Sequence, residues 1–354
     1  MATNYNYEKA LSLEWNGKMH ILTVRNELDY TGFNYLYSAD GTTWSTSSDL
    51  SNSTILTQKN PYNVRWTGSH YDIIGNLSTS SGNSILRSLD GIKYSVINTN
   101  LTGPIYDLET NLEYPHTIVF PKNITLAVGG NIGDTTKIAY STDEGITWTP
   151  SVNSSQVFTT TATNAVWTGK KWIATGIGGN TIGISYDGNT WIGQGSYALT
   201  TAGYTVDWSK EQALAIVGGS GTNSLAYSNC GCYWIGLGNT ILSTVYDIKW
   251  NGTIWVAGGV PVSGNKSLAY SYDGKTWGFP SQTDLFDQYA LNLSWNGSFW
   301  IASGKSSINN NSYNLATSSN GIDWKMQNNI IMGGNISGIY SIPTLRKTIF
   351  TYLQ

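Results

Sequence analysis

Charged residues are scarce in this chain of 354 residues: Asp, Glu, Lys and Arg together make up 12% of it. With aromatic residues at 13%, the composition is not that of a disordered chain, which is rich in charge and poor in aromatics. The formal net charge of −3 argues against a nucleic-acid surface, which needs clustered Lys and Arg. No hydrophobic run approaches the roughly 18 residues of a membrane-spanning helix. We therefore expect no nucleic-acid partner and no membrane span.

Cysteine is nearly absent, with only Cys230 and Cys232 in the whole chain. Two thiols cannot build a disulfide framework, and this usage fits a reducing compartment. A Cys-x-Cys pair could hold a metal ion, but His20, His70 and His116 are scattered elsewhere and complete no recognisable site. We expect free thiols in a divergent turn, with no metal and no cofactor.

A sustained 3.6-residue apolar period is also missing, and 39 glycines make long helices unfavourable. The chain instead contains short alternating segments such as LAYSYD and FWIASG, bounded by NG and DG dipeptides. Asn-Gly and Asp-Gly accept the positive φ that tight hairpin turns require. The pattern predicts an all-β fold of short strands and tight turns.

One motif recurs through the chain with the consensus Ser-x-Asp-Gly-x-Thr-Trp, and we call each copy a box. The clearest copies are Ser38–Trp44, Ser185–Trp191 and Ser271–Trp277, and the copy Ser141–Trp148 has one extra residue before its glycine. The aspartate positions run from 40 to 320 over six intervals, roughly 47 residues each, which is typical of a four-stranded propeller blade. The boxes occupy residues 38–44, 88–94, 141–148, 185–191, 228–234, 271–277 and 318–324.

A second motif, Trp-x-Gly followed by an apolar strand that ends in Gly, precedes each box and reads as a hairpin. One repeat is therefore strand, NG-type turn, strand, loop, strand, DG-type turn and strand. The hairpin motif begins at Trp15, Trp66, Phe120, Trp167, Trp208, Trp250 and Trp295.

The box residues have a physical reason to recur in a turn. Asp is short enough to accept hydrogen bonds from backbone N–H groups of its own turn, and Trp anchors the outer strand by burying a large apolar area. The aspartates occur in different repeats, whereas an active site is one place, so we predict a structural role for them. These predicted structural residues are Asp40, Asp90, Asp143, Asp187, Asp273, Trp44, Trp148, Trp191 and Trp277.

These boxes resemble the Asp-box, or BNR, repeats of the sialidase-like β-propeller superfamily. The copy Ser141–Trp148 has the usual spacing of that family, and most other copies are one residue shorter. The pairing of Trp-x-Gly hairpins with short boxes is also similar to uncharacterised repeat proteins of giant DNA viruses. The resemblance implies a propeller whose boxes are turn staples remote from the catalytic face of the family.

We predict a single β-propeller domain over residues 1–354, with seven four-stranded antiparallel blades. A C-terminal half-repeat, residues 339–353, follows the last box and looks like another first hairpin. It either overlaps the first blade to close the ring or caps the outside, and an eight-bladed ring is the alternative.

A sialidase would need an arginine cluster for the substrate carboxylate, a Tyr–Glu nucleophile pair and a separate acid. The chain has only Arg25, Arg65, Arg87 and Arg346, and no Tyr–Glu pair is recognisable. We therefore predict no catalytic residue and no enzymatic activity. Other propeller glycosidases use two carboxylates, but no recognisable pair is formed by Glu14, Glu27, Asp29, Asp72, Asp107 and Glu109.

Two function classes remain. The first is a non-enzymatic structural or protein-interaction propeller, with a virion component as one form of it; the second is a glycan-binding lectin or a glycosidase. The N-terminal sequence MATNYNYEKALSLEW lacks a basic start and an apolar core, so we expect no signal peptide and a cytoplasmic or virion location. The expected display loops, polar insertions between repeat strands, are Asn26–Gly32, Leu50–Tyr62, Asn98–Tyr114 and Lys305–Tyr313.

Overall fold

The computed structural model shows an all-β chain with a single short helix, α1 (Ser154–Val157), among the residues that it describes. None of the described helical structure is long and apolar enough to cross a membrane. The described residues are 9–25, 33–47, 60–67, 69–79, 82–99, 101, 103–110, 124–131, 133–264, 266–282, 285–306 and 312–332.

The first sheets are antiparallel meanders, in which each strand pairs with the next one along the chain. The short strand β7 is an addition to the second sheet, where it pairs with β8. The strands are β1 (Lys9–Trp15), β2 (His20–Arg25), β3 (Phe33–Ser38) and β4 (Ser45–Ser47); β5 (Asn60–Trp66), β6 (Tyr71–Asn76), β7 (Ser78–Thr79), β8 (Gly82–Ser88) and β9 (Ser95–Asn98); and β10 (Ile105–Thr110), β11 (Thr125–Gly129), β12 (Ile138–Ser141) and β13 (Thr149–Pro150).

The later strands repeat the same meander. Single residue pairs, Ile177 with Ala202 and Ser220 with Thr244, connect three successive units into one larger sheet. The strands are β14 (Phe158–Trp167), β15 (Trp172–Gly179), β16 (Ile182–Ser185) and β17 (Ile192–Gly193); β18 (Ala202–Ser209), β19 (Leu214–Ser220), β20 (Leu225–Ser228) and β21 (Ile235–Gly236); β22 (Thr244–Trp250), β23 (Trp255–Val260) and β24 (Leu268–Ser271); and β25 (Tyr289–Trp295), β26 (Trp300–Ser306), β27 (Ser312–Ser318) and β28 (Lys325–Met332).

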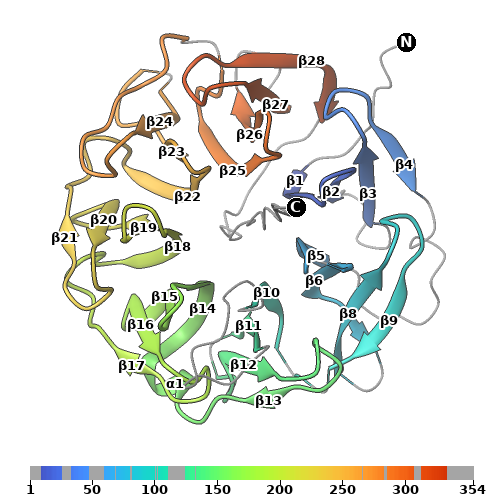
Figure 1. Cartoon of the computed structure of the whole chain (residues 1–354), viewed down its shortest axis with the longest axis vertical. Helices are drawn as coiled ribbons and strands as arrows, with labels where there is room; N and C mark the ends of the chain where they lie inside the picture. The colour runs from blue at the N-terminus through green and yellow to red at the C-terminus, as the bar shows by residue number, and fades with distance from the viewer. Residues whose placement is uncertain are drawn as a thin grey trace, which may run out of the picture.

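The units follow one another around a centre in chain order (Figure 1). In each unit the first strand faces the centre and the last strand lies at the periphery, so that β1, β5, β10, β14, β18, β22 and β25 are the inner strands (Figure 1). Inner and second strands such as β11 and β22 are buried on both faces. Each sheet is covered by a neighbour on either side, which explains the continuous apolar run of β11 and also the burial of Asp247 and Lys249 in β22.

The core is divided among the spaces between neighbouring units. One cluster joins Ile254 and Val256 of the β22–β24 unit to Trp300 and Leu293 of the β25–β28 unit. Another joins Leu13 and its neighbours in the first unit to residues of the last described unit, and β1 contacts β25 directly. Apolar area buried between units therefore stabilises the fold, at about 25 cal/mol per Å².

Some segments differ in the structure from what the sequence predicts, and others lie outside the described residues. The segment Asn98–Tyr114 is not a display loop throughout, because it contains the buried inner strand β10. The first strand of that unit therefore precedes Phe120, which lies outside the described residues, as do the half-repeat 339–353 and the loop Asn26–Gly32. The described residues also exclude 50–59 of Leu50–Tyr62 and 307–311 of Lys305–Tyr313.

Candidate functional site

Each of the aspartate box turns is held by the same hydrogen bonds. After β16, the Ser185 hydroxyl donates to Asp187 Oδ1 at 3.0 Å, and the N–H groups of Asn189 and Thr190 donate to the same oxygen at 2.9 and 2.7 Å. The N–H of Gly188 donates to Ser185 Oγ at 2.9 Å. The aspartates that accept two N–H groups in this way are Asp40, Asp90, Asp143, Asp187 and Asp273.

These bonds lower the pKa of the box carboxyls. Partial burial alone would raise the pKa of Asp273, but the N–H groups of Thr276 and Lys275 and the hydroxyl of Ser271 outweigh burial and bring this pKa to about 2. The pKa values of the other box aspartates are lowered as well. The carboxylates belong to different units and accept bonds within their own turns, so the structure brings them to no shared site.

Tryptophan closes several of the turns with a further bond. The indole Nε1–H of Trp191 donates to the carbonyl oxygen of Gly188 at 3.2 Å, and Trp44 and Trp148 make the same bond to their own box glycines at 3.2 and 3.0 Å. Trp277 differs, because its ring is only half-buried and its Nε1 has no partner among the described residues. The four tryptophans are therefore not equivalent anchors.

The box glycines also touch the preceding unit. A Cβ added at Gly274, after β24, would lie 2.6 Å from Ile216 Cδ1 in β19, and one added at Gly41 would lie 3.0 Å from Phe299 Cε2, next to β26. The box turn thus contacts the preceding unit and also fixes the hairpin within its own unit. Glycines with this contact and a φ between +66° and +79° are Gly41, Gly91, Gly145, Gly188, Gly231, Gly274 and Gly321.

Every inner strand carries a β-bulge at the same place. In β22 the pairing with β23 shifts between Val245 and Asp247, so Tyr246 is the extra residue. The same shift occurs in β1, β5, β10, β14, β18 and β25. A bulge redirects the side chains that follow it. The residue after each bulge is polar, and together these residues form the inner polar ring: Ser12, Asn63, Asp107, Asn164, Thr205, Asp247 and Asn292.

Hydrogen bonds across neighbouring units connect the inner polar ring. Asp107 Oδ1 accepts a bond from Asn63 Nδ2 at 3.2 Å, and Asp107 Oδ2 accepts one from Asn164 Nδ2 at 2.8 Å. The backbone N–H of Val206 donates to Asn164 Oδ1 at 2.7 Å. The N–H of Leu293 donates to Asp247 Oδ2 at 2.8 Å. The inner polar ring therefore forms hydrogen bonds to buried polar groups between units. Apolar side chains at the same positions would leave those groups without hydrogen bonds.

Charged residues follow two positions further along several inner strands. Arg65 forms a buried ion pair with Glu109 of the next unit. Asp207 accepts the backbone N–H of Trp250 in the next unit at 2.7 Å. Lys249 Nζ lies 3.4 Å from Asp247 Oδ1. The side chains of these ion pairs are at most 6% exposed, so their charges act inside the protein rather than on solvent: Arg65 and Glu109 pair between two units, and Lys249 and Asp247 pair along one strand.

Burial raises the pKa of the acidic groups in this region. It brings the pKa of Asp107 to about 8, against the charge of Arg65, and that of Asp247 to about 6, against the charge of Lys249. It also raises the pKa of Glu14 well above its ordinary value. With these pKa values Asp107 is mostly protonated at neutral pH, whereas Asp247 is mostly ionised.

The described arginines already bind carboxylates of the chain. Arg65 and Arg87 lie on either side of Asp72 in the register of β5, β6 and β8. Arg87 Nε and Nη2 each donate to Asp72 at 2.8 Å, and Arg65 is paired with Glu109. Neither the side chain of Arg25 nor Arg346 is among the described residues. No described arginine pair is thus presented to a substrate carboxylate.

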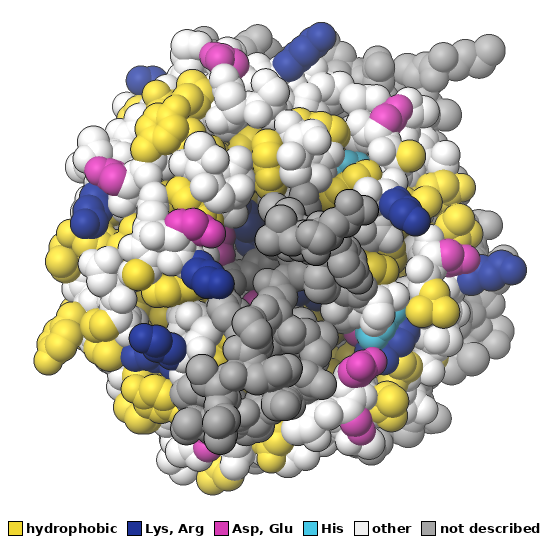
Figure 2. All heavy atoms as spheres, in the orientation of Figure 1, with side chains coloured by type: hydrophobic (Ala, Val, Ile, Leu, Met, Phe, Trp, Pro, Cys, Tyr) yellow, Lys and Arg dark blue, Asp and Glu magenta, His cyan; other side chains and the backbone are white. Residues whose placement is uncertain are grey.

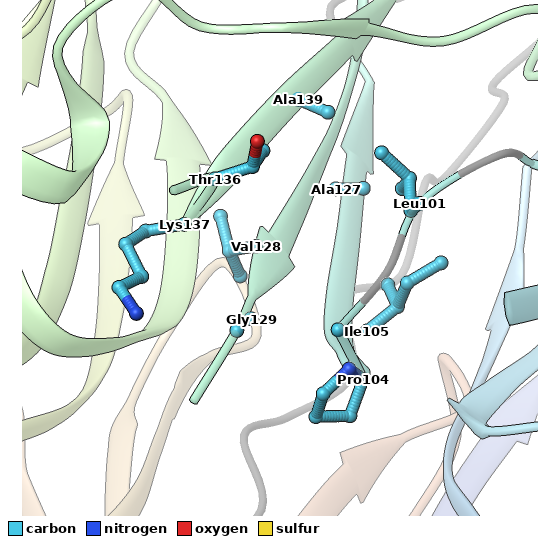
Figure 3. Close-up of a pocket in the computed structure, with 11 residues that line it drawn as sticks. Leu101, Pro104, Ile105, Ala127, Val128, Gly129, Thr136, Lys137 and Ala139 are labelled. Atoms are coloured by element: carbon cyan, nitrogen blue, oxygen red, sulfur yellow. The ribbon is translucent and has the colours of Figure 1, made fainter. Parts of the chain in front are cut away.

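A small pocket lies beside β10 and β11. Its cavity volume of about 20 Å³ accommodates about one water molecule, which excludes a sugar ring. Leu101 and Ile105 lie on one side and Lys137 on the other (Figure 3). The Lys137 ammonium donates to the carbonyl oxygen of Asn131, so this charge is already engaged.

Among the described residues of the face shown in Figure 2, acidic and basic side chains are scattered among polar and apolar ones and form no patch of one sign. In the described part of the chain no three His, Cys, Asp or Glu residues are grouped to hold a metal ion. Exposed tyrosines lie in three successive box turns: Tyr186 is 48% exposed, Tyr233 81% and Tyr272 58%. We call these three residues the tyrosine edge.

No family model and no curated protein matches the sequence, but solved structures match its fold. The computationally designed Ika8 protein is similar with a TM-score of 0.52 and 10% identity, covering 88% of this chain and 84% of that one. A chain of the Mitotic Checkpoint Complex is similar with a TM-score of 0.53 and 14% identity, covering 90% and 87%.

The fold is β-propeller-like. The Niastella koreensis GH74 enzyme also matches, with a TM-score of 0.37 and 11% identity; the match covers 88% of this chain and 54% of that one. At these identities the comparisons describe the architecture alone.

Sequence reasoning missed the inner polar ring. Its signal is a polar residue three positions before the hairpin tryptophan, as in Asn164 before Trp167 and Asp247 before Trp250. The bulge hides this signal, because an extra residue breaks the period of two that an inner strand would otherwise show.

Proposed function

We propose that this chain is a non-enzymatic β-propeller scaffold that binds a protein partner. The observation that carries the proposal is the inner polar ring, whose carboxylates are used to join sheets. Both oxygens of Asp107 accept amide bonds from neighbouring units, and both oxygens of Asp247 are engaged as well. A glycosidase needs two carboxyl groups that face the sugar on either side of its scissile bond. The described carboxylates of the ring have no such freedom.

The proposed propeller has seven blades. The supporting contact is that of Gly41 with Phe299, which repeats between the first and the last described units the contact that other box glycines make with a preceding unit. The contact of β1 with β25 supports the same closure. An experimental structure with an additional blade, formed by residues 339–353, would establish the eight-bladed alternative.

We also assign the boxes to the Asp-box type. The hydroxyl of the serine, the carboxylate of the aspartate and the indole of the tryptophan form one repeated bond pattern, as in Ser38, Asp40 and Trp44. This pattern supports the resemblance because it gives each consensus residue a bond to make.

The tyrosine edge is the proposed partner surface. Tyr and other aromatic residues are enriched at protein interfaces, where they bury large areas at low entropic cost. The Lys171 ammonium lies 5.5 Å from the Tyr186 ring centroid and 3.2 Å from Cys232 Sγ, which places two of the tyrosine turns side by side. A propeller of similar fold occurs in the Mitotic Checkpoint Complex, which is consistent with a protein-binding use of this architecture.

A capture experiment tests the partner. The purified chain is compared with the double variant Tyr233→Ser, Tyr272→Ser in cross-linking from extracts of the source, with quantitative mass spectrometry. The matched control is Leu89→Ser, Ile146→Ser, which removes exposed apolar side chains from other units. We expect one set of proteins to be lost with the tyrosine variant alone. Equal capture by all three proteins would contradict the tyrosine edge as a partner surface.

The alternative is a glycan-directed protein, and exposed tyrosine rings are the feature that favours it, since such rings can stack on sugars. A glycan array together with a panel of glycosidase substrates separates the two classes. We expect neither binding nor turnover. Turnover abolished by one Asp or Glu substitution would overturn the non-enzymatic proposal. The virion form of the scaffold predicts the chain in purified source particles, and its cytoplasmic form predicts it outside them.

A further inference from the structure

The box at residues 228–234 departs from the others in a way that changes its chemistry. Cys230 occupies the aspartate position, and Cys232 follows it after Gly231. The backbone N–H of Cys232 donates to Cys230 Sγ at 3.1 Å, as N–H groups donate to aspartate oxygens in the other boxes. The Ser228 hydroxyl lies 3.7 Å from the same sulfur. The sulfur thus replaces a carboxylate oxygen in a turn built to hold negative charge.

The second thiol lies beside a positive charge. The Lys171 ammonium, from the turn between β14 and β15, donates to Cys232 Sγ at 3.2 Å. Cys230 is exposed and Cys232 is half-buried, so small solutes in solution reach the pair. A thiolate is the reactive form of cysteine, and N–H donors and lysine are the groups that stabilise it.

We propose that Cys230 and Cys232 form a redox-active dithiol, which hydroperoxides oxidise to an intramolecular disulfide and dithiol reductants restore. Cys230 is the attacking thiolate and Cys232 the resolving thiol. This modification site adjoins the tyrosine edge through Tyr233 and Lys171, but its chemistry requires no bound partner.

The chemistry balances in two steps. The Cys230 thiolate attacks a peroxide oxygen, an S–O bond forms and the O–O bond breaks; the sulfur loses two electrons, and the leaving hydroxide takes a proton to become water. The Cys232 sulfur then attacks the sulfenic acid, an S–S bond forms and the S–O bond breaks, and hydroxide leaves with the thiol proton as water. Two thiols and one hydrogen peroxide therefore give one disulfide and two waters.

The backbone allows the second step. Consecutive Cα atoms are about 3.8 Å apart, so those of Cys230 and Cys232 are separated by no more than about 7.6 Å in any conformation. The left-handed bend at Gly231, with φ +66°, shortens this separation further. A disulfide spans about 4.4–6.8 Å between Cα atoms.

The electrostatics of the turn agree with these roles. Partial burial would raise the pKa of Cys230, but hydrogen bonds from the N–H groups of Tyr233 and Cys232 and from Ser228 bring it to about 7. About half of the thiol is then ionised at neutral pH, against a few per cent of an ordinary cysteine.

The test uses the full chain, oxidised with a small excess of hydrogen peroxide and analysed by peptide mass spectrometry after alkylation. We expect the peptide with both cysteines to lose two hydrogens in mass, and the reaction of Cys230 with iodoacetamide to be half-maximal near pH 7. In Cys232→Ser we expect a sulfenic acid on Cys230 that dimedone traps. Half-maximal alkylation at or above about pH 8.5, or oxidation that yields only disulfides between two chains, would overturn the proposal.

A matched control is Cys230→Asp, which restores the sequence of the other boxes and should retain the fold. Its melting temperature should be unaffected by peroxide, whereas that of the parent chain should change on oxidation. The experiment is repeated with a metal chelator present throughout. Thiols that react only after chelation would identify a bound soft metal instead of a free dithiol, and would also overturn the proposal.

Discussion

A single carboxylate in a box turn accepts several hydrogen bonds at once, so its removal should lower the free energy of unfolding while the chain still folds. We expect Asp187→Ala to lower the free energy of unfolding by on the order of 1–2 kcal/mol, because the N–H groups of Asn189 and Thr190 lose their acceptor. Asp187→Asn is the control, since Asn320 already accepts two N–H groups at this position of the last box. Denaturant unfolding measures both; equal losses for Ala and Asn would contradict the bond argument.

The two tryptophans Trp191 and Trp277 should differ in their contribution to stability, although the sequence presents them as equivalents. Trp191 is 2% exposed and bonded through its indole, so Trp191→Ala should cost about 3–5 kcal/mol. Trp277 is half-buried without that bond, and Trp277→Ala should cost less than half as much. Thermal unfolding of the two variants side by side measures the difference. A larger loss for Trp277 would be inconsistent with burial as the cause.

An inner strand contributes to stability through the polar side chain that follows its bulge as well as through its strand pairing. We expect Asn164→Leu to lower the free energy of unfolding by about 2–4 kcal/mol, since Asp107 loses a donor and the Val206 N–H loses its acceptor. Ser294→Ala, on β25, is the control: its side chain is buried and makes no described hydrogen bond to another unit, and we expect a change below about 1 kcal/mol. Similar losses in the two variants would contradict an energetic role of the ring.

Short-range signals made the hairpins predictable from the sequence. The Asn-Gly turn after Trp250 and the Asp-Gly turn after Ser271 each encode their geometry within a few residues, and the structure has β22, β23 and β24 there. The inner polar ring was not predictable in the same way. Its partners, such as Asn63 and Asp107, lie 44 residues apart, and only the assembled units bring them together.

The inner strand β10 illustrates the same limit. The sequence places the corresponding hairpin motif at Phe120, because Thr110 stands where other repeats have tryptophan. Without the hairpin tryptophan, the sequence predicts a loop for this strand, because the strand lies within a polar segment. Burial from both neighbours, and not local propensity, makes Ile105–Thr110 a strand.

Stability of the whole molecule should be greatest in mildly acidic solution. The box aspartates have lowered pKa values, so their contribution is complete above the unfolded pKa of about 4 and is lost as the pH falls below it. Asp107 and Asp247 have raised pKa values, about 8 and about 6, so their contribution is complete below about pH 4 and is lost as the pH rises through those values. Melting temperatures from pH 3 to pH 9 should therefore pass through a maximum near about pH 4–5.

The variant Asp107→Asn tests the fall in stability on the high-pH side of that profile. It removes the titrating proton of the ring, so the fall in stability between about pH 6 and pH 8 should become shallower than in the parent chain. Asp187→Asn, in a box, should leave the same fall in stability unchanged. A parent profile that is flat over this range would contradict protonation of Asp107 in the folded state.

The contact between the first and last described units has a consequence for the order of folding. Within a unit, partners are near neighbours along the chain, whereas Asn296 Nδ2 and His20 Nε2, which are 3.5 Å apart, are separated by 276 residues. Bringing such distant segments together costs more loop-closure entropy than forming any one hairpin, and non-local contacts slow folding. Individual meanders can therefore form early while the junction of β1 with β25 forms last. In pulsed hydrogen exchange during refolding, the amides of β1 and β25 should gain protection later than those of β14 and β15.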